Sequence, residues 1–229
     1  MEENTSECPP NFAADDAIEQ MLEAHFDKFA VPKQEICRNF QIYTRRAFLK
    51  RFLAHYEFFQ QVINLPGDIV ELGVHRGGSL MSWANFLEIR NMGDRQKKVI
   101  GFDYFPEEFV EQLEDAINIF DSDRFIPYKP RVILVKGDIQ HTVPEYVEQN
   151  PNLRISLLHI DVDFYQPTLV GLQYLWQRVV TGGIVLFDGY GVSPWSGESK
   201  AVDDFFADQK ITIKRLDWCS SPGGYIVKT

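Results

Sequence analysis

Two aspartates, Asp161 and Asp163, end the apolar segment LLHIDVDFY at residues 157–165. An apolar run of this length is typical of a buried strand, and buried strands carry carboxylates only where these have partners or a ligand. In an open parallel sheet, ligands bind outside the carboxyl ends of the strands. We therefore expect Asp161 to lie at the mouth of a cleft, where its carboxylate could hold a metal ion or accept a proton.

Acidic residues also end the other four apolar segments that precede helical patterns: Glu71, Asp103, Asp138 and Asp188. One acidic residue in such a place is usually the N-cap of the next helix, but five in succession favour a binding site. Asp163 would face the same side as Asp161 on an extended backbone and could join the site. It could equally be the N-cap of the helix that begins near Pro167.

The segment VELGVHRGGS, which contains Glu71, is rich in glycine, and glycine lets the backbone approach a ligand closely. Its spacing differs from the G-x-G-x-x-G of dinucleotide-binding proteins, which disfavours a nicotinamide-dependent oxidoreductase. Asp103 at the end of the second strand suits the two hydroxyls of a ribose. An adenosine ligand without a pyrophosphate, and with a cationic sulfonium, would fit so acidic an edge.

The elements that must position these residues alternate along the chain. Apolar segments at 68–74, 98–103, 131–138, 154–161 and 182–188 predict strands, and the segments between them predict helices. This alternation indicates an α/β fold with a parallel sheet covered by helices on both faces. Two last segments, 211–217 and 223–229, flank a Ser-Pro-Gly-Gly turn and predict an antiparallel hairpin at the edge, which makes seven strands.

Two helical patterns, at about 14–29 and 45–64, come before the first strand. We expect residues 1–64 to form a tail and a helical cap, and residues 65–229 to form a single globular domain. Within the second helix, the basic residues at helical spacing are expected to form a solvated face: Arg45, Arg46, Lys50 and Arg51.

Composition narrows the class of protein. The net charge of −10 argues against binding nucleic acid through a general basic field. The 3 cysteines show neither a metal-binding spacing nor a disulfide framework. The polar N-terminus does not resemble a signal peptide, and no apolar stretch is long enough to span a membrane. We therefore expect a cytosolic protein.

Six segments together resemble a known family. GDIVELGVHRGGS, GFDYF, KGDI, HIDVDFYQPT, GGIVLFDGYG and KAVDDFF are similar, in this order, to the S-adenosylmethionine-dependent sugar O-methyltransferases of the macrocin and mycinamicin type. The resemblance extends from about Tyr43 to Phe206. It implies the class I, Rossmann-like methyltransferase fold, S-adenosylmethionine as cofactor, a divalent metal that is usually Mg²⁺, and a deoxysugar hydroxyl as methyl acceptor. It also implies a homo-oligomer.

The resemblance assigns roles to the residues at the strand ends. The methionine portion of the cofactor would be held by Glu71, Gly73 and Ser79. The ribose would bind Asp103, and the adenine would lie between Asp138 and Ile139. Asp161 and Asp188 would hold the metal from neighbouring strands. The family usually has a second acid directly after the one at 188, whereas this chain has Gly189. Either water or Asp163 completes the metal site, or there is no functional metal.

Further candidates concern the base and the acceptor. A sugar hydroxyl must lose its proton as the methyl group arrives, and Asp161, His75 or His141 could accept that proton. His159 lies inside an apolar strand and is expected to be a core residue. The acceptor could meet aromatic or basic side chains near the cleft: Tyr43, Arg45, Tyr190 and Trp195.

Two other functions stay open. The Asp-x-Asp pair could belong to a metal-dependent glycosyltransferase, although that reading does not explain Glu71, Asp103 and Asp138. The chain could also be a relative that binds the cofactor without catalysis, as the missing acid at 189 allows. The identity of the acceptor and the position of methylation cannot be read from the sequence.

Overall fold

The computed structural model describes residues 10–194 and 196–229. They divide into two compact units, with the boundary between Leu49 and Lys50. This boundary lies earlier than the predicted one between residues 64 and 65, because most of the second predicted helix packs on the sheet. Its side chains Ala54, Phe58 and Val62 are fully buried in the core of the larger unit.

The smaller unit is helical. It contains α1 (Pro10–Phe29), α2 (Lys33–Arg38), α3 (Phe40–Tyr43) and the start of α4 (Arg46–Val62). The ring of Tyr43 packs against His25 and Phe26, with centroids 6.1 Å and 5.6 Å away. Arg45 pairs with Glu19 at 3.1 Å. None of the helices that the structure describes is long and apolar enough to cross a membrane.

The larger unit is built on one sheet with strand order β3-β2-β1-β4-β5-β6. All neighbours are parallel except β5 and β6. The strands are β1 (Asp68–Leu72), β2 (Val99–Asp103), β3 (Val132–Lys136), β4 (Ile155–Ile160), β5 (Val179–Phe187) and β6 (Gly224–Val227). The helices are α5 (Gly78–Asn91), α6 (Glu107–Ser122), α7 (Ile139–Gln149), α8 (Tyr165–Leu175), the 3₁₀ turn Trp176–Arg178, and α9 (Ser196–Phe206).

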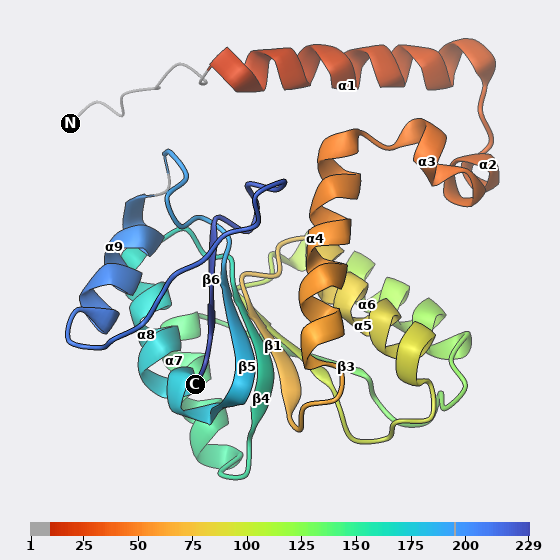
Figure 1. The fold of residues 1–229 in the computed structure, drawn as a ribbon. Coiled ribbons are helices and arrows are strands. Elements are labelled where there is room, and N and C mark those ends of the chain that lie inside the picture. Colours follow the sequence, from red (N-terminus) through yellow and green to blue (C-terminus); the bar gives the residue numbers. More distant parts are fainter. Residues whose placement is uncertain (1–9, 195) are drawn as a thin grey trace. The chain divides into compact units, whose positions relative to one another are not determined.

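Each face of the sheet has its own core, as expected for parallel strands covered on both sides. On one face α4, α5 and α6 pack against the sheet, and on the other α7, α8 and α9 do (Figure 1). Side chains alternate between the faces along each strand. In β1, Ile69 joins the core under α4 and α5, while Val70 and Leu72 join the core under α7 and α8.

The predicted parallel sheet and its antiparallel edge are confirmed, but the number of strands is six and not seven. Residues 211–217 form no strand. Their backbone pairs with β6 only through a bridge in which Lys214 and Tyr225 exchange hydrogen bonds of 2.8 Å and 2.7 Å. Pairing stops there because the chain then turns toward α4, where Leu216 and Cys219 join the core.

Candidate active site

The register of the sheet sets three polar side chains side by side. Glu71 on β1 pairs with His159 on β4, so both point to the face covered by α4 and α5. Asp188 follows β5 with the same parity as Leu186, which pairs with His159. The two ring nitrogens of His159 lie 3.4 Å from Glu71 Oε2 and 3.5 Å from Asp188 Oδ1. His159 thus joins two carboxylates inside the protein.

Helix α4 adds two basic side chains to this face. Arg51 Nη2 lies 2.6 Å from Asp161 Oδ2 and 3.2 Å from Asp188 Oδ1, so one guanidinium nitrogen joins the acids that follow β4 and β5. His55, one turn further along α4, is buried with its ring centroid 5.2 Å from that of His159. Its Nε2 atom is buried without a hydrogen-bond partner.

The expectation that Arg51 lies on a solvated helix face is therefore wrong. Four side chains of α4 share one stripe at intervals of four, three and four residues: Arg51, His55, Phe58 and Val62. That spacing marks the buried side of an amphipathic helix, and the last three are buried as it predicts. This signal could have identified Arg51 and His55, because a polar residue on a buried stripe needs a partner inside.

The charges of this group are strongly coupled. Burial alone would lower the pKa of His159, but its contacts with Asp188 and Glu71 raise it well above the ordinary value. Burial alone would raise the pKa of Asp188, but His159 and Arg51 hold it at about 2. Burial and the nearby Asp188 raise the pKa of Asp161. Of the two acids that Arg51 joins, Asp161 is therefore the better proton acceptor.

The predicted methionine-binding residues Glu71 and Ser79 contact each other. Glu71 is fully buried, and its two oxygens accept hydrogen bonds from Ser79 Oγ at 2.8 Å and Trp83 Nε1 at 2.9 Å. Both donors come from α5. This arrangement fixes the start of α5 against β1, next to the glycine turn, and the role of Glu71 in cofactor binding stays a prediction.

The glycine turn is tied to the end of β2 through Asp103. Its Oδ2 accepts hydrogen bonds of 2.7 Å from both backbone amides of Val74 and His75. Gly73 has φ +85°, and a Cβ there would lie 1.9 Å from the carbonyl oxygen of Asp161. Only glycine allows the ends of β1 and β4 to approach this closely. Asp103, Gly73 and Asp161 thus lie on three adjacent strand ends at one edge of the sheet.

Asp138 and Ile139, the predicted adenine neighbours, begin α7 after the edge strand β3. Asp138 is the N-cap of this helix and accepts a hydrogen bond of 2.9 Å from the amide of Gln140. His141 lies one turn further along, and its side chain is 85% exposed. Three strand spacings, roughly 14 Å, separate β3 from β4, so the strand order disfavours His141 as a base that acts beside Asp161.

Asp163 does not cap α8, because Phe164 holds that position. Burial and the charge of Asp188 raise the pKa of Asp163. Sequence reasoning missed a nearby acid, Glu198, which is fully buried at the start of α9. Its Oε1 accepts a hydrogen bond of 2.8 Å from the amide of Gly189, while its Oε2 has no partner. Burial and then Asp188 raise the pKa of Glu198 to about 8.

Among the described residues, the predicted metal ligands Asp161, Asp163 and Asp188 do not make up one group of close ligand atoms. Within residues 10–194 and 196–229, one group of three or more His, Cys, Asp or Glu side chains has ligand atoms all within 4.8 Å of one another. That group is His55, His159 and Asp188. It does not include Asp161 or Asp163, and Arg51 lies between Asp161 and Asp188.

The residues predicted to bind the methyl acceptor belong to different parts of the chain. Tyr43 and Arg45 belong to the smaller unit, where Arg45 pairs with Glu19. Tyr190 donates a hydrogen bond of 2.9 Å from its hydroxyl to Asp203 Oδ1, and its ring packs on Phe187. Trp195 lies outside the described residues. Binding of the acceptor by these four residues stays a prediction.

Known proteins resemble this chain in sequence. The model of the macrocin O-methyltransferase family (TylF) matches residues 49–222. A demethyldecarbamoylnovobiocin O-methyltransferase of Streptomyces niveus is 28% identical over 66% of this chain and 64% of its own length. The mycinamicin III 3''-O-methyltransferase of Micromonospora griseorubida is 26% identical over 55% of this chain and 56% of its own length. The chain thus spans somewhat more than half of each of these relatives.

Solved structures give a broader match. CalS11, described as a TDP-rhamnose 3'-O-methyltransferase of calicheamicin biosynthesis, superposes with a TM-score of 0.87 at 26% identity and covers 97% of this chain and 96% of its own. The O-methyltransferase NovP, at 24% identity and a TM-score of 0.62 over 79% of this chain and 80% of its own, supports the fold. The predicted class I methyltransferase fold is confirmed.

Proposed function

Since the chain belongs to the macrocin O-methyltransferase family, we propose that it transfers a methyl group from S-adenosylmethionine to a hydroxyl of a sugar. The observation that carries this proposal is the family match over residues 49–222, which includes all the acidic strand ends. The glycosyltransferase alternative has no support from the family or from the similar structures.

The cofactor would bind over the ends of β1, β2 and β3. Asp103 would accept hydrogen bonds from the ribose hydroxyls, chiefly through Oδ1, since Oδ2 already accepts the amides of Val74 and His75. The glycine turn allows the methionine portion to approach the backbone, with Ser79 and Glu71 beneath it. The adenine would lie beside Asp138 and Ile139 at the start of α7.

The acceptor would bind over the ends of β4 and β5. There the acceptor oxygen attacks the methyl carbon, the C–S bond breaks with its electron pair going to sulfur, and the sulfonium becomes a neutral thioether. Asp161 would accept the hydroxyl proton, because its raised pKa makes it the stronger base of the pair with Asp188. The remaining requirement is alignment of oxygen, carbon and sulfur.

Mg²⁺, the predicted second cofactor, does not fit the residues present. Mg²⁺ needs several oxygen ligands at about 2.0–2.1 Å. Asp161 Oδ2 and Asp188 Oδ1 instead contact Arg51, and Ser221 Oγ lies within 3.2 Å of both oxygens of Asp188. The position after Asp188 is Gly189, which offers no carboxylate. No step of the proposed reaction therefore passes through a metal.

The acceptor class follows from the relatives. CalS11 is named for TDP-rhamnose, and a 4'-O-methyltransferase of Streptomyces olivaceus is named for a rhamnosyl group on tetracenomycin C. We extend to this chain only what they share, a sugar hydroxyl. A homo-oligomer and a cytosolic location stay predictions.

The test begins with isothermal titration of the protein with S-adenosylhomocysteine. We expect saturable binding at one site, followed by a mass gain of one methyl group when S-adenosylmethionine is supplied with a panel of nucleotide-linked deoxysugars and glycosylated natural products. Absence of any affinity for either form of the cofactor would overturn the proposal. Binding without methylation of any acceptor would favour the non-catalytic relative.

A further inference from the structure

We propose that the guanidinium of Arg51 takes the place of a divalent metal between Asp161 and Asp188, so that this chain binds no metal there and methylates without one. The inference rests on the proposed methyl transfer for its catalytic part. Its binding part rests on geometry alone, so the two parts can fail separately.

The first support is the position of the guanidinium. A metal joining the acids after β4 and β5 would use one oxygen from each, and Arg51 Nη2 lies 2.6 Å from Asp161 Oδ2 and 3.2 Å from Asp188 Oδ1. A cation could bind these oxygens only after Arg51 had moved away. The positive charge that a metal would supply is thus already present on the protein.

The second support is the set of other contacts around Asp188. Its Oδ1 lies 3.5 Å from His159 Nε2 and 3.2 Å from Ser221 Oγ, and its Oδ2 lies 3.1 Å from the same hydroxyl. Every oxygen that Asp188 could offer to a metal has a neighbour that can donate a hydrogen bond to it. A divalent ion would have to replace these contacts, and it would lie beside a guanidinium of like charge.

The third support is the lack of a further carboxylate in reach. Position 189 offers no carboxylate: the backbone amide of Gly189 donates to Glu198 Oε1, and its carbonyl oxygen accepts a hydrogen bond from the amide of Val192. Among the described residues, neither Glu198 nor Asp163 belongs to a group of three whose ligand atoms lie within 4.8 Å of one another. The acids are close enough to share Arg51, but they do not form a cage for an ion.

Arg51 can also perform the electrostatic task of a metal. Both carboxylate contacts use Nη2, and a guanidinium carries five N–H donors, so the other nitrogens can donate to the acceptor hydroxyl. The side chain is 35% exposed, which leaves it accessible to a substrate. During transfer Arg51 would stabilise the negative charge on the attacking oxygen while Asp161 takes its proton and the C–S bond breaks.

Direct binding of Mn²⁺, followed by electron paramagnetic resonance, tests the first part without any substrate. We expect wild-type protein to leave Mn²⁺ free in solution, and Arg51→Ala to bind it only weakly, because the substitution removes the competing cation but leaves two carboxylates as the only ligands. Lys50→Ala removes a neighbouring exposed positive charge and should behave as wild type. Tight binding of Mn²⁺ by wild-type protein would overturn the proposal if Asp161→Asn abolished that binding.

Methyl transfer tests the second part. We expect wild-type turnover to stay within about twofold after removal of metals with a chelator, and Arg51→Ala to lose about 100-fold or more. Arg51→Lys should keep more activity than Arg51→Ala, because a lysine retains one charged donor. A wild-type enzyme that stops with chelator and recovers with Mg²⁺ would overturn the proposal.

Two further outcomes have a defined meaning. If no acceptor is methylated under any condition, the proposed function fails, while the Mn²⁺ measurement still decides what lies between Asp161 and Asp188. If Arg51→Ala does not fold, as judged by its melting curve, the wild-type Mn²⁺ and chelator measurements decide on their own. Wild-type protein that neither binds Mn²⁺ nor responds to chelator supports the proposal in that case.

Discussion

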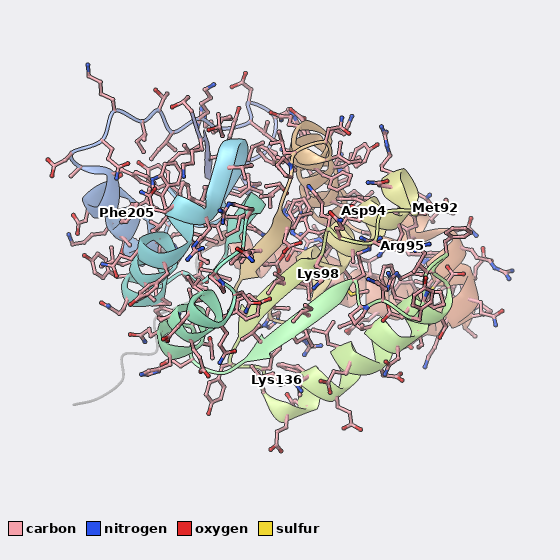
Figure 2. The ribbon with its side chains drawn as sticks, turned by 90° about the horizontal axis from the view of Figure 1, so that it is seen from below. Met92, Asp94, Arg95, Lys98, Lys136 and Phe205 are labelled. Atoms are coloured by element: carbon pink, nitrogen blue, oxygen red, sulfur yellow. The ribbon has the colours of Figure 1, made fainter. Side chains whose placement is uncertain are left out.

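The two ends of the sheet both bury charged groups, but they treat them differently. At the amino end, Lys97 Nζ donates to Val62 O at 3.1 Å and to Ser156 Oγ at 2.9 Å. Beside it, Arg131 donates to Glu88 and to two backbone carbonyls. The loop before β2, with Asp94, Arg95 and Lys98, lies at this end (Figure 2). Each buried cation here has its partners within the protein.

At the carboxyl end the pairing is incomplete. Two of the buried side-chain nitrogen and oxygen atoms that the structure describes have no hydrogen-bond partner. They are His55 Nε2 and Glu198 Oε2, and both belong to residues at the carboxyl end. An unpaired buried polar atom costs stability, and native proteins have few of them. The comparison indicates that charge at the amino end stabilises the fold, while two buried polar groups at the carboxyl end keep a capacity for hydrogen bonds that other protein groups do not use.

The largest expected effect comes from Asp161→Asn. The amide keeps the shape of the side chain but cannot accept the hydroxyl proton as a carboxylate does, so we expect turnover to fall about 100- to 10,000-fold. The dissociation constant of S-adenosylhomocysteine should change by less than about twofold. Asp204→Asn on the surface of α9 is the matched control and should keep the wild-type rate. Unchanged turnover in Asp161→Asn would remove this residue from the mechanism.

The carboxyl end was predictable from the sequence where an acid is the last residue of a strand or directly follows it. Strand ends are set by the apolar pattern, and parallel strands bring their carboxyl ends to one edge, so Asp103, Asp161 and Asp188 could be placed together. Arg51 and His55 come from a helix far away in the sequence. Their side of α4 was predictable from its stripe, but the partners they meet depend on how α4 packs on the sheet, which no local pattern specifies.

The next largest effect should be at the amino end. Arg131 is 2% exposed, and Arg131→Met leaves Glu88 and two carbonyls without their donor. We expect the free energy of unfolding in urea to fall by about 3 to 5 kcal/mol, with cofactor affinity unchanged. Arg95→Met, at an exposed position of the same end, should cost less than about 0.5 kcal/mol. Equal effects of the two substitutions would contradict a structural role of Arg131.

The segment that was predicted as a seventh strand also shows what a local sequence pattern leaves out. The start of segment 211–217 alternates apolar and polar side chains as far as Lys214, which predicts a strand, and Lys214 does pair with Tyr225. The pattern records which side chains are buried but not against what. Leu216 and Cys219 are buried in the core under α4, so the chain leaves the sheet after one bridge. A local sequence pattern cannot show that burial of side chains in a distant core competes with pairing of the backbone in the sheet.

Glu198→Gln tests whether a buried acid at the carboxyl end lowers the free energy of unfolding. The folded protein holds the Glu198 proton up to a pKa of about 8, while the unfolded chain loses it near 4.5. Stability therefore falls as pH rises between these values, and the glutamine variant lacks this loss. The variant should equal wild type near pH 4.5 and exceed it by about 2 to 4 kcal/mol at pH 8 in urea unfolding.

The matched control for this comparison is Glu148→Gln on the exposed side of α7. It should show no difference from wild type that grows with pH. A constant difference between Glu198→Gln and wild type across the pH range would mean that Glu198 is ionised in the folded protein. Its burial would then not lower the stability of the protein as pH rises.

The smallest expected effect should separate two parts of the carboxyl end: the proposed cofactor half over β1, β2 and β3, and the proposed acceptor half over β4 and β5. Asp103→Asn keeps an oxygen for the amides of Val74 and His75 but loses the charge proposed to meet the ribose. We expect the dissociation constant of S-adenosylhomocysteine to rise about tenfold, with turnover at saturating cofactor changed by less than about threefold. Asp123→Asn at the exposed end of α6 should leave both unchanged. A loss of turnover without a loss of affinity would place Asp103 with the acceptor and end the assignment of β2 to the cofactor half.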